Sequence, residues 1–376
     1  MATPNQRYSG SHDLIRSWGV PVRLLPDELF STWIVRAALK QGCDPLVLTG
    51  EVWGKWRILT IDADRINDET VFRSIAYVSG NTIENFKQNS LYSTASKIIG
   101  GNPPEKAIWP WIMALGSRNT KRNGGVQYCP LCLAEDAKPY YRRQWRFAWH
   151  TACEKHLVLL LDCCFVCGSP LEPHRLSAED RYIHICATCK ADLSQAPIQP
   201  VSAEMLAYQN QTDKVIKLGY GEFQEQSINA IEWFKLADFF ISMLRRSNRS
   251  RAIILHDFLS QIAKPLPNNF PILTGKGIEK LQTKDRLTLF THLYPLMMVS
   301  KERFEKSAYK IGLTRQSLRS KEEMLPEALR YIYEALPDNA RIRTKRVKRN
   351  RYQPRPRHEV MSMMARLERK LEMARR

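Results

Sequence analysis

Cys129-Pro130-Leu131-Cys132 opens the stretch that decides the fold, residues 129–189, which holds seven of the nine cysteines of the chain. Three further two-ligand motifs follow: Cys153-Glu154-Lys155-His156, Cys164-Phe165-Val166-Cys167 and Cys186-Ala187-Thr188-Cys189. Two thiolates separated by two residues can reach one ion, and a second such pair completes a tetrahedron. Soft thiolates and a neutral imidazole suit zinc. The spacing therefore predicts two zinc sites, the first formed by Cys129, Cys132, Cys153 and His156, the second by Cys164, Cys167, Cys186 and Cys189.

Other uses of these cysteines remain as alternatives. The alternative is a set of disulfides or ordinary buried thiols. Disulfides are disfavoured in an intracellular basic protein, and the adjacent Cys163 and Cys164 would pair awkwardly. Cys163 is an alternative ligand to Cys164, but only Cys164 is in register with Cys167. His150 is an alternative to His156, but only His156 keeps the two-residue gap after its cysteine.

The ligand count predicts structural rather than catalytic zinc. A catalytic zinc keeps one coordination position open for water. Here eight ligands fill two sites, and no His-x-Glu precedes a Pro-Cys-x-x-Cys as in zinc deaminases. We therefore expect two structural Zn²⁺ ions and no enzymatic activity. Gly168, directly after Cys167, fits the positive φ that such a motif needs at its end.

Positive charge is concentrated at the end of the chain. Lys and Arg outnumber Asp and Glu by 57 to 38, a formal +19. From Asn339 onward, fourteen Lys or Arg face three Glu, which is +11 and leaves +8 (19 − 11) for the rest. Such a tail suits nucleic acid better than a membrane, because no amphipathic aromatic face accompanies the charge, although a merely solubilising tail is the alternative. Phosphate contacts are expected from Arg341, Arg343, Lys345, Arg346, Lys348 and Arg349.

Length and hydropathy favour two or three folded domains without a membrane span. The chain has 376 residues, and its longest strongly apolar run is only Leu157–Leu161. A membrane-spanning helix needs roughly 20 apolar residues. The first residues are polar and lack the apolar stretch of a secretory signal. We therefore expect a soluble, intracellular protein.

Helical patterns precede the cysteine motifs. Residues 26–42 predict an amphipathic helix started by Pro26-Asp27, followed by a loop that carries Trp53 and Trp56. Residues 68–92 predict a helix-turn-helix, with a purely structural helix pair as the equal alternative. Its turn contains Gly80 and its second helix starts near Thr82, presenting Glu84, Lys87, Gln88 and Asn89 outward, although Asn81 takes a place that is usually apolar.

Arginines alternate with aromatic residues over 140–150, inside the first zinc motif. This pattern predicts contacts of Arg142 and Arg143 with nucleic acid, because such side chains bind phosphates and stack on bases. It fits equally a half-buried strand whose arginines face water. Both interpretations are compatible.

Helical patterns return after residue 200. An apolar face over 228–244 predicts a core helix, and residues 300–333 predict a second helix-turn-helix with its turn at Gly312. Thr314 is expected to cap the second helix of this pair. Groove contacts are expected from Arg315, Gln316 and Arg319. Residues 360–376 have apolar spacing typical of a helix that docks on a partner or lies along DNA.

The ordered motifs resemble the TniQ family, the TnsD-related target-selection proteins of transposons. The resemblance covers residues 20–195 and is carried by three kinds of feature. These are Pro26-Asp27-Glu28-Leu29 with Trp33 and Arg36, the cysteine motifs from Tyr128 to Gly168 with Leu159 and Leu171, and the pair Trp145-Arg146 between them.

The resemblance implies a non-enzymatic role in transposition. Members of this family recognise a target, either DNA directly or an RNA-guided CRISPR effector complex, and recruit an AAA+ ATPase and then the transposase. It implies a bacterial cytoplasmic protein whose eight zinc ligands are those named above; whether it forms a homodimer is open. The expected fold is mainly α with small β elements in zinc knuckles or ribbons, and with helix-turn-helix segments flanking a double zinc-finger module. Its expected domains are 1–120 (helical), 121–200 (zinc fingers), 201–337 (helical) and 338–376 (basic tail).

Overall fold

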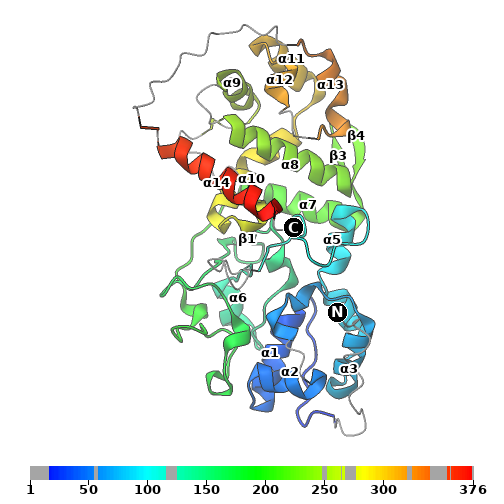
Figure 1. Cartoon of the computed structure of the whole chain (residues 1–376), viewed down its shortest axis with the longest axis vertical. Helices are drawn as coiled ribbons and strands as arrows, with labels where there is room; N and C mark the ends of the chain where they lie inside the picture. The colour runs from blue at the N-terminus through cyan, green and yellow to red at the C-terminus, as the bar shows by residue number, and fades with distance from the viewer. Residues whose placement is uncertain are drawn as a thin grey trace. The chain divides into compact units, whose positions relative to one another are not determined.

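The chain folds into two compact units, Met1–Ser202 and Ala203–Arg376. This computed structural model describes residues 17–54, 58–115, 125–247, 252–263, 265–266, 277–319, 324–338, 354–355 and 357–374. Helices predominate in both units, and two small antiparallel sheets of two strands each accompany them among these residues (Figure 1). The mainly helical fold class is thereby confirmed. No helix within the described ranges is long and apolar enough to cross a bilayer.

Among the described residues of the first unit, five α-helices precede the cysteine motifs: α1 (Phe30–Gln41), α2 (Pro45–Trp53), α3 (Glu69–Ser79), α4 (Ile83–Asn89) and α5 (Tyr92–Ile99). Helices α1 to α4 share a core that contains a cluster of aromatic rings. Phe30 of α1 meets Phe72 of α3 edge-on at 5.5 Å, and Trp33 meets Phe86 of α4 at 4.9 Å between ring centroids. Edge-to-face pairs of this kind add to the stabilisation from burial. The cluster holds α1 against both α3 and α4.

The first helix begins later than its sequence pattern predicts. Asp27 has φ 59°, which no right-handed helix allows, so α1 starts at Phe30 rather than near residue 26. The expected loop after it is also wrong over residues 45–53, which form α2 with Pro45 at its first position. Trp53 is buried in the core, and Trp56 lies outside the described residues.

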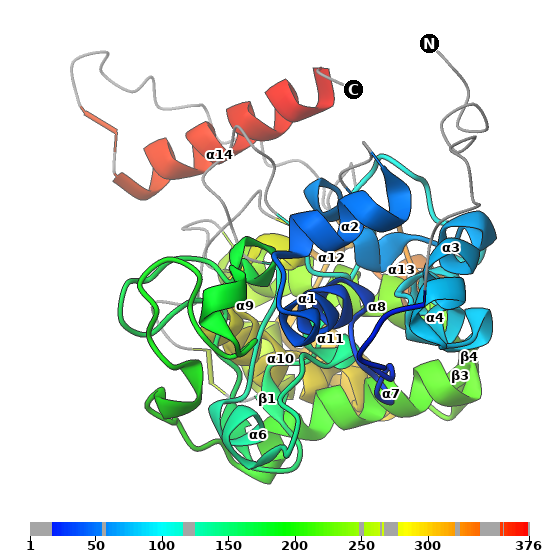
Figure 2. The ribbon, with the colours of Figure 1, turned by 90° about the horizontal axis from the view of Figure 1, so that it is seen from below.

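A three-residue turn joins α3 to α4, and the two helices pack on each other (Figure 2). Gly80 has φ 69° and ends α3, and Thr82 caps α4 in a reciprocal capping box with Asn85. Asn81 fills the place usually held by an apolar residue because its amide bonds the chain at Val22 and Leu24. The prediction that Asn89 faces outward is wrong, since this residue is buried and donates to two backbone carbonyls.

The cysteine-rich part of the first unit has little regular structure. It contains α6 (Pro130–Glu135) and a short hairpin of β1 (Ala152–Cys153) and β2 (Val158–Leu159), with Cys153 opposite Val158. The alternating residues 140–150 do not form the strand that their pattern allowed. Residues Arg143–Arg146 form a 3₁₀ turn instead. Successive side chains of a 3₁₀ turn point in different directions. Arg143 therefore contacts Asp27, whereas Arg146 contacts Asp62 and Asp64.

The second unit is built around one long apolar helix, α8 (Ala230–Ser247). It packs against three others, and buries Trp233 and Phe240 completely. Its helices are α7 (Ala207–Leu218), α8, α9 (Ile253–Ile262), α10 (Thr283–Met297), α11 (Lys301–Ile311), α12 (Arg315–Leu318), α13 (Arg330–Ala335) and α14 (Arg357–Ala374). The predicted core helix is confirmed from Ala230 onward, whereas Ile228 belongs to a hairpin of β3 (Tyr220–Phe223) and β4 (Gln226–Asn229).

The second predicted helix pair consists of α11 and a single-turn α12. Gly312 ends α11 with φ 71°, Leu313 is buried, and Thr314 caps α12 by accepting from the Ser317 backbone N–H. Only four residues form α12. A helix of one turn is about 6 Å long, much shorter than the segment that usually reads a DNA groove.

The terminal segment forms the predicted helix, α14. Its apolar side chains at Met361, Met364, Leu367 and Leu371 are all more than half exposed.

Candidate metal centres

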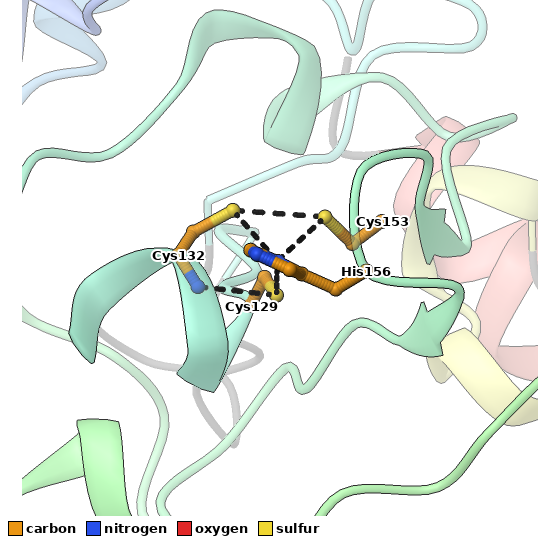
Figure 3. A group of neighbouring side chains, drawn as sticks. All are labelled: Cys129, Cys132, Cys153 and His156. Atoms are coloured by element: carbon orange, nitrogen blue, oxygen red, sulfur yellow. Dashed lines mark hydrogen bonds between the residues drawn. The ribbon is translucent and has the colours of Figure 1, made fainter. Parts of the chain in front are cut away.

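The first group of predicted ligands converges on one point (Figure 3). Cys129 and Cys132 come from the start of α6, Cys153 ends β1, and His156 lies in the turn before β2. The four ligand atoms lie within 4.8 Å of one another. His156 uses Nδ1, which is 3.3 Å from the Cys129 sulfur, 3.4 Å from Cys132 and 3.5 Å from Cys153.

These distances fit a tetrahedral zinc site. With Zn–S bonds of about 2.3 Å and Zn–N bonds of about 2.0 Å, a tetrahedron has S–S edges of about 3.8 Å and S–N edges of about 3.5 Å. The sulfurs of Cys132 and Cys153 are 3.6 Å apart, and the three S–N distances lie between 3.3 and 3.5 Å. The group could therefore bind zinc without rearrangement.

The second group is assembled in the same way from four sulfurs. Cys164 is 3.6 Å from Cys189, and Cys167 is 3.8 Å from Cys186, again with all ligand atoms within 4.8 Å. Cys163 is not part of this group, so the register with Cys167 correctly singled out Cys164. His150 likewise stays outside the first group and is buried against Phe147 and Trp149.

Three of the four motifs share one backbone device. The carbonyl of the first ligand accepts a hydrogen bond from the N–H four residues later, and that later residue has a positive φ. Gly168 (φ 66°), Lys190 (φ 63°) and Leu157 (φ 51°) take this position. Gly168 confirms the expected role of the glycine. The other two positions carry side chains that disfavour this conformation.

The three sulfurs of the first group lie close enough to influence one another's ionisation. Hydrogen bonds with the sulfurs of Cys129 and Cys153 raise the pKa of the Cys132 thiol far above its usual range, and burial and repulsion between neighbouring thiolates raise it further. A divalent cation reverses this effect, since it attracts every thiolate at once. The group therefore has the chemistry of a metal site rather than of three independent thiols.

The arginines between the cysteine motifs bind acidic residues of the same unit. Arg146 is fully buried and donates to Asp62 at 2.6 and 3.0 Å and to Asp64 at 2.8 Å. Burial raises the pKa of Asp64, and the Arg146 charge opposes that rise. Sequence reasoning missed both aspartates, which lie more than eighty positions away. Their spacing gives no signal of this contact.

The segment that leads into the first helix has a comparable internal role. Glu28 is fully buried, and Arg36 holds it through two bonds of 2.6 and 2.7 Å. Burial raises the pKa of Glu28, partly offset by that hydrogen bond. The backbone on either side pairs with the arginine segment, from Leu29 N–H to Tyr141 and from Arg143 N–H to Asp27. These contacts join α1 to the cysteine-rich part.

The predicted nucleic-acid residues occupy different surroundings. The Nη2 atom of Arg142 donates to both carboxylate oxygens of Asp136 at 3.0 Å, and Arg143 pairs with Asp27 at 3.2 Å. Arg315 donates to the carbonyls of Tyr333 and Glu334 at the end of α13, and Arg319 lies 5.9 Å from the Tyr333 ring. Gln316 is exposed. The tail residues Arg341, Arg343, Lys345, Arg346, Lys348 and Arg349 lie outside the described residues.

Comparison with known protein families gives a match over part of the chain. Residues 20–160 match the model of the TniQ family. Over this segment the chain is similar to the TniQ family. The TniQ match begins before α1 and ends after His156, so it includes the first ligand group and stops short of Cys164. No curated protein matches the chain.

The family match limits the range of functions that can be proposed for the chain. TniQ proteins are associated with transposition and are not a known enzyme family. The residues of the matched segment have the arrangement of a scaffold, because its ion pairs and its one ligand group join elements to one another.

Proposed function

We propose that this TniQ protein selects targets for transposition: it binds target DNA and recruits a transposon AAA+ ATPase and the transposase. Two structural Zn²⁺ ions hold its first unit in shape. The observation that carries the proposal is the TniQ match over residues 20–160, which contains a ligand group with tetrahedral spacing.

The zinc ions have a structural role in this proposal. Cys129, Cys132, Cys153 and His156 would hold the first ion, and Cys164, Cys167, Cys186 and Cys189 the second. Each set supplies four ligands, so no position is left for a reacting water. When bound, each ion neutralises its thiolates and cross-links segments that have few hydrogen bonds of their own.

The DNA contacts are assigned to the second unit and the tail. On α11, Lys306 and Lys310 are exposed around Tyr309, whose exposed fraction is 58%. Exposed Gln316 follows on α12. Lysines around an exposed aromatic ring suit a phosphate backbone with a stacking or groove contact beside it. The tail adds the larger share of charge, +11 from residue 339 onward.

The salt dependence of binding tests the tail. We expect the log–log slope of duplex binding against salt to flatten by about 0.9 for each phosphate that the protein no longer neutralises. Replacing Arg341, Arg343, Lys345, Arg346, Lys348 and Arg349 by Ala therefore flattens the slope by up to about 5. Fluorescence anisotropy with a labelled duplex at several salt concentrations measures it. A variant with Arg and Lys exchanged at these positions is the control, and an unchanged slope in the Ala variant rules out phosphate binding by the tail.

A matched pair of double variants tests the α11 surface. Lys306→Ala with Lys310→Ala should weaken duplex binding, whereas Lys214→Ala with Lys217→Ala, which removes two exposed lysines of α7, should weaken it less. Equal losses in both variants would mean that α11 contributes only to the general charge.

A second function is favoured by one set of observations. Arg142, Arg143 and Arg315 are engaged within the protein, and α12 is a single turn. A protein that docks on an RNA-guided CRISPR effector complex needs no helix to read bases. Co-purification with such a complex, together with no duplex binding at low salt, would select this adaptor role over direct DNA recognition.

A further inference from the structure

Glu135, the last residue of α6, lies beside the only imidazole ligand of the first group. Its Oε2 atom is 2.9 Å from His156 Nε2 and 2.7 Å from Lys155 Nζ. The other ring nitrogen, Nδ1, is the one that faces the three sulfurs. The two nitrogens of His156 therefore have different partners, a carboxylate on one side and the metal position on the other.

This arrangement selects one tautomer of the imidazole. An ionised carboxylate only accepts hydrogen bonds, so the nitrogen that faces Glu135 carries the proton. Nδ1 then keeps its lone pair, which is what a metal ion requires. A hydrogen bond to a carboxylate also fixes the ring plane of a metal-binding histidine and makes it a better ligand.

The ion pair with Lys155 does not account for the position of Glu135. Both partners are well exposed, 61% for the lysine and 49% for the glutamate, and exposed pairs contribute little to stability. His156, in contrast, is 8% exposed. The hydrogen bond to the imidazole is thus the contact with a defined geometry.

We propose that Glu135 is a positioning residue of the first metal site, which orients His156 and fixes its proton on Nε2. The proposal rests on the zinc binding proposed above. Helix α6 carries Cys129 and Cys132 in its first turn and Glu135 at its end, so one rigid element sets the thiolates and the carboxylate relative to each other. The function of Glu135 is therefore to pre-organise the fourth ligand.

Zinc competition on the full chain tests this role. We expect Glu135→Ala to weaken the affinity for one of the two zinc ions by about 10–100-fold, as loss of such carboxylates does in other sites. Glu135→Gln keeps an oxygen that can accept from Nε2 and should lose less. Lys155→Ala removes the exposed pair alone and should change the affinity at most about fivefold. Titration of the zinc-loaded proteins with a chromophoric chelator gives both affinities.

A His156→Cys background separates positioning from a general effect on α6. A thiolate has no ring to orient, so Glu135→Ala should no longer weaken zinc binding there. The proposal is overturned if Glu135→Ala costs the same in both backgrounds, or no more than Lys155→Ala does. If the unaltered protein binds fewer than two zinc ions per chain, the zinc sites themselves are wrong, and that failure is distinct.

Discussion

At the scale of single residues, buried charge is placed where it joins distant segments. Arg146 has no exposed surface and contacts Asp62 and Asp64, of which Asp64 is 1% exposed. A buried pair is expensive to form, but removing one partner leaves an uncompensated charge. Arg143, one turn earlier, makes a similar contact with Asp27 near the surface. The two arginines therefore make the same kind of ion pair but differ in the free energy needed to bury their charge.

Replacing Arg146 by Met should destabilise the first unit by about 3–5 kcal/mol, because two aspartates lose their buried counter-charge. Replacing Arg143 by Met should cost about 0–1 kcal/mol, since its pair is partly solvated. Urea denaturation followed by tryptophan fluorescence compares them. Equal costs would show that Arg146 is not held as a buried ion.

A glycine of the second unit is required for packing rather than for its backbone conformation. A Cβ on Gly221 would lie 2.7 Å from Val215 and 2.9 Å from the Trp233 ring. We expect Gly221→Ala to cost about 1–3 kcal/mol through overpacking. Gly50 inside α2 has open space, so Gly50→Ala should stabilise by about 0.5–1 kcal/mol. Thermal unfolding measures whether each substitution raises or lowers stability. A Gly221→Ala variant of unchanged stability would mean that Val215 and Trp233 move aside at no cost.

At the scale of elements, the metal-binding turns repeat one backbone conformation with different residues. Gly168 adopts it without strain, whereas Lys190 and Leu157 adopt it against the preference of their side chains. The surrounding hydrogen bonds and the positions of the ligands hold these residues in the unfavourable conformation. Sequence spacing alone predicts the ligands but only the glycine among the three turn residues.

Lys190→Gly should stabilise the second group by about 0.5–1 kcal/mol, because glycine tolerates a positive φ and a lysine does not. Lys190→Ala is the matched control: it also loses the ion pair with Asp180, whose side chain is 7% exposed, but keeps the unfavourable conformation. Denaturation of the zinc-loaded proteins should therefore rank Gly above Ala. The reverse order would mean that the positive φ at residue 190 costs less than the backbone entropy that a glycine loses on folding.

At the scale of the whole molecule, the first unit joins two kinds of structure. Helices α1 to α4 have an aromatic core, while the cysteine-rich part has little regular structure of its own. Arg146 and the paired backbone at Asp27, Leu29, Tyr141 and Arg143 connect them. We therefore expect metal binding at the two ligand groups to influence the helices as well as the turns that carry the ligands.

Removal of zinc by a chelator should loosen the first unit beyond the ligand turns. In hydrogen-exchange measurements on the full chain, we expect α1 and residues 143–146 to lose protection, because they are fastened to the zinc-bound segments. Helices α8 and α10, which pack on each other within the second unit, should keep theirs. Unchanged protection of α1 after complete zinc loss would show that the metal has no structural role there.

Local features of the sequence were sufficient for the ligand groups and several helix ends. A two-residue gap brings two ligands to one ion whatever the rest of the chain does, so Cys164 and His156 could be chosen over Cys163 and His150. A glycine that permits a positive φ ends α3 and α11 for equally local reasons. The family followed from the same ordered motifs and is matched over residues 20–160.

By itself, then, the sequence determined the ligand spacing, the helical face of the core and the uneven charge, because each depends on neighbours along the chain. Only the tertiary structure decided that Arg146 and Asn89 are buried, and that Glu135 meets His156. Those contacts join residues about twenty to eighty positions apart. A charged or polar side chain is favourable on the surface without a partner, but it can be buried only where a partner is in place. No local pattern in the sequence specifies that partner.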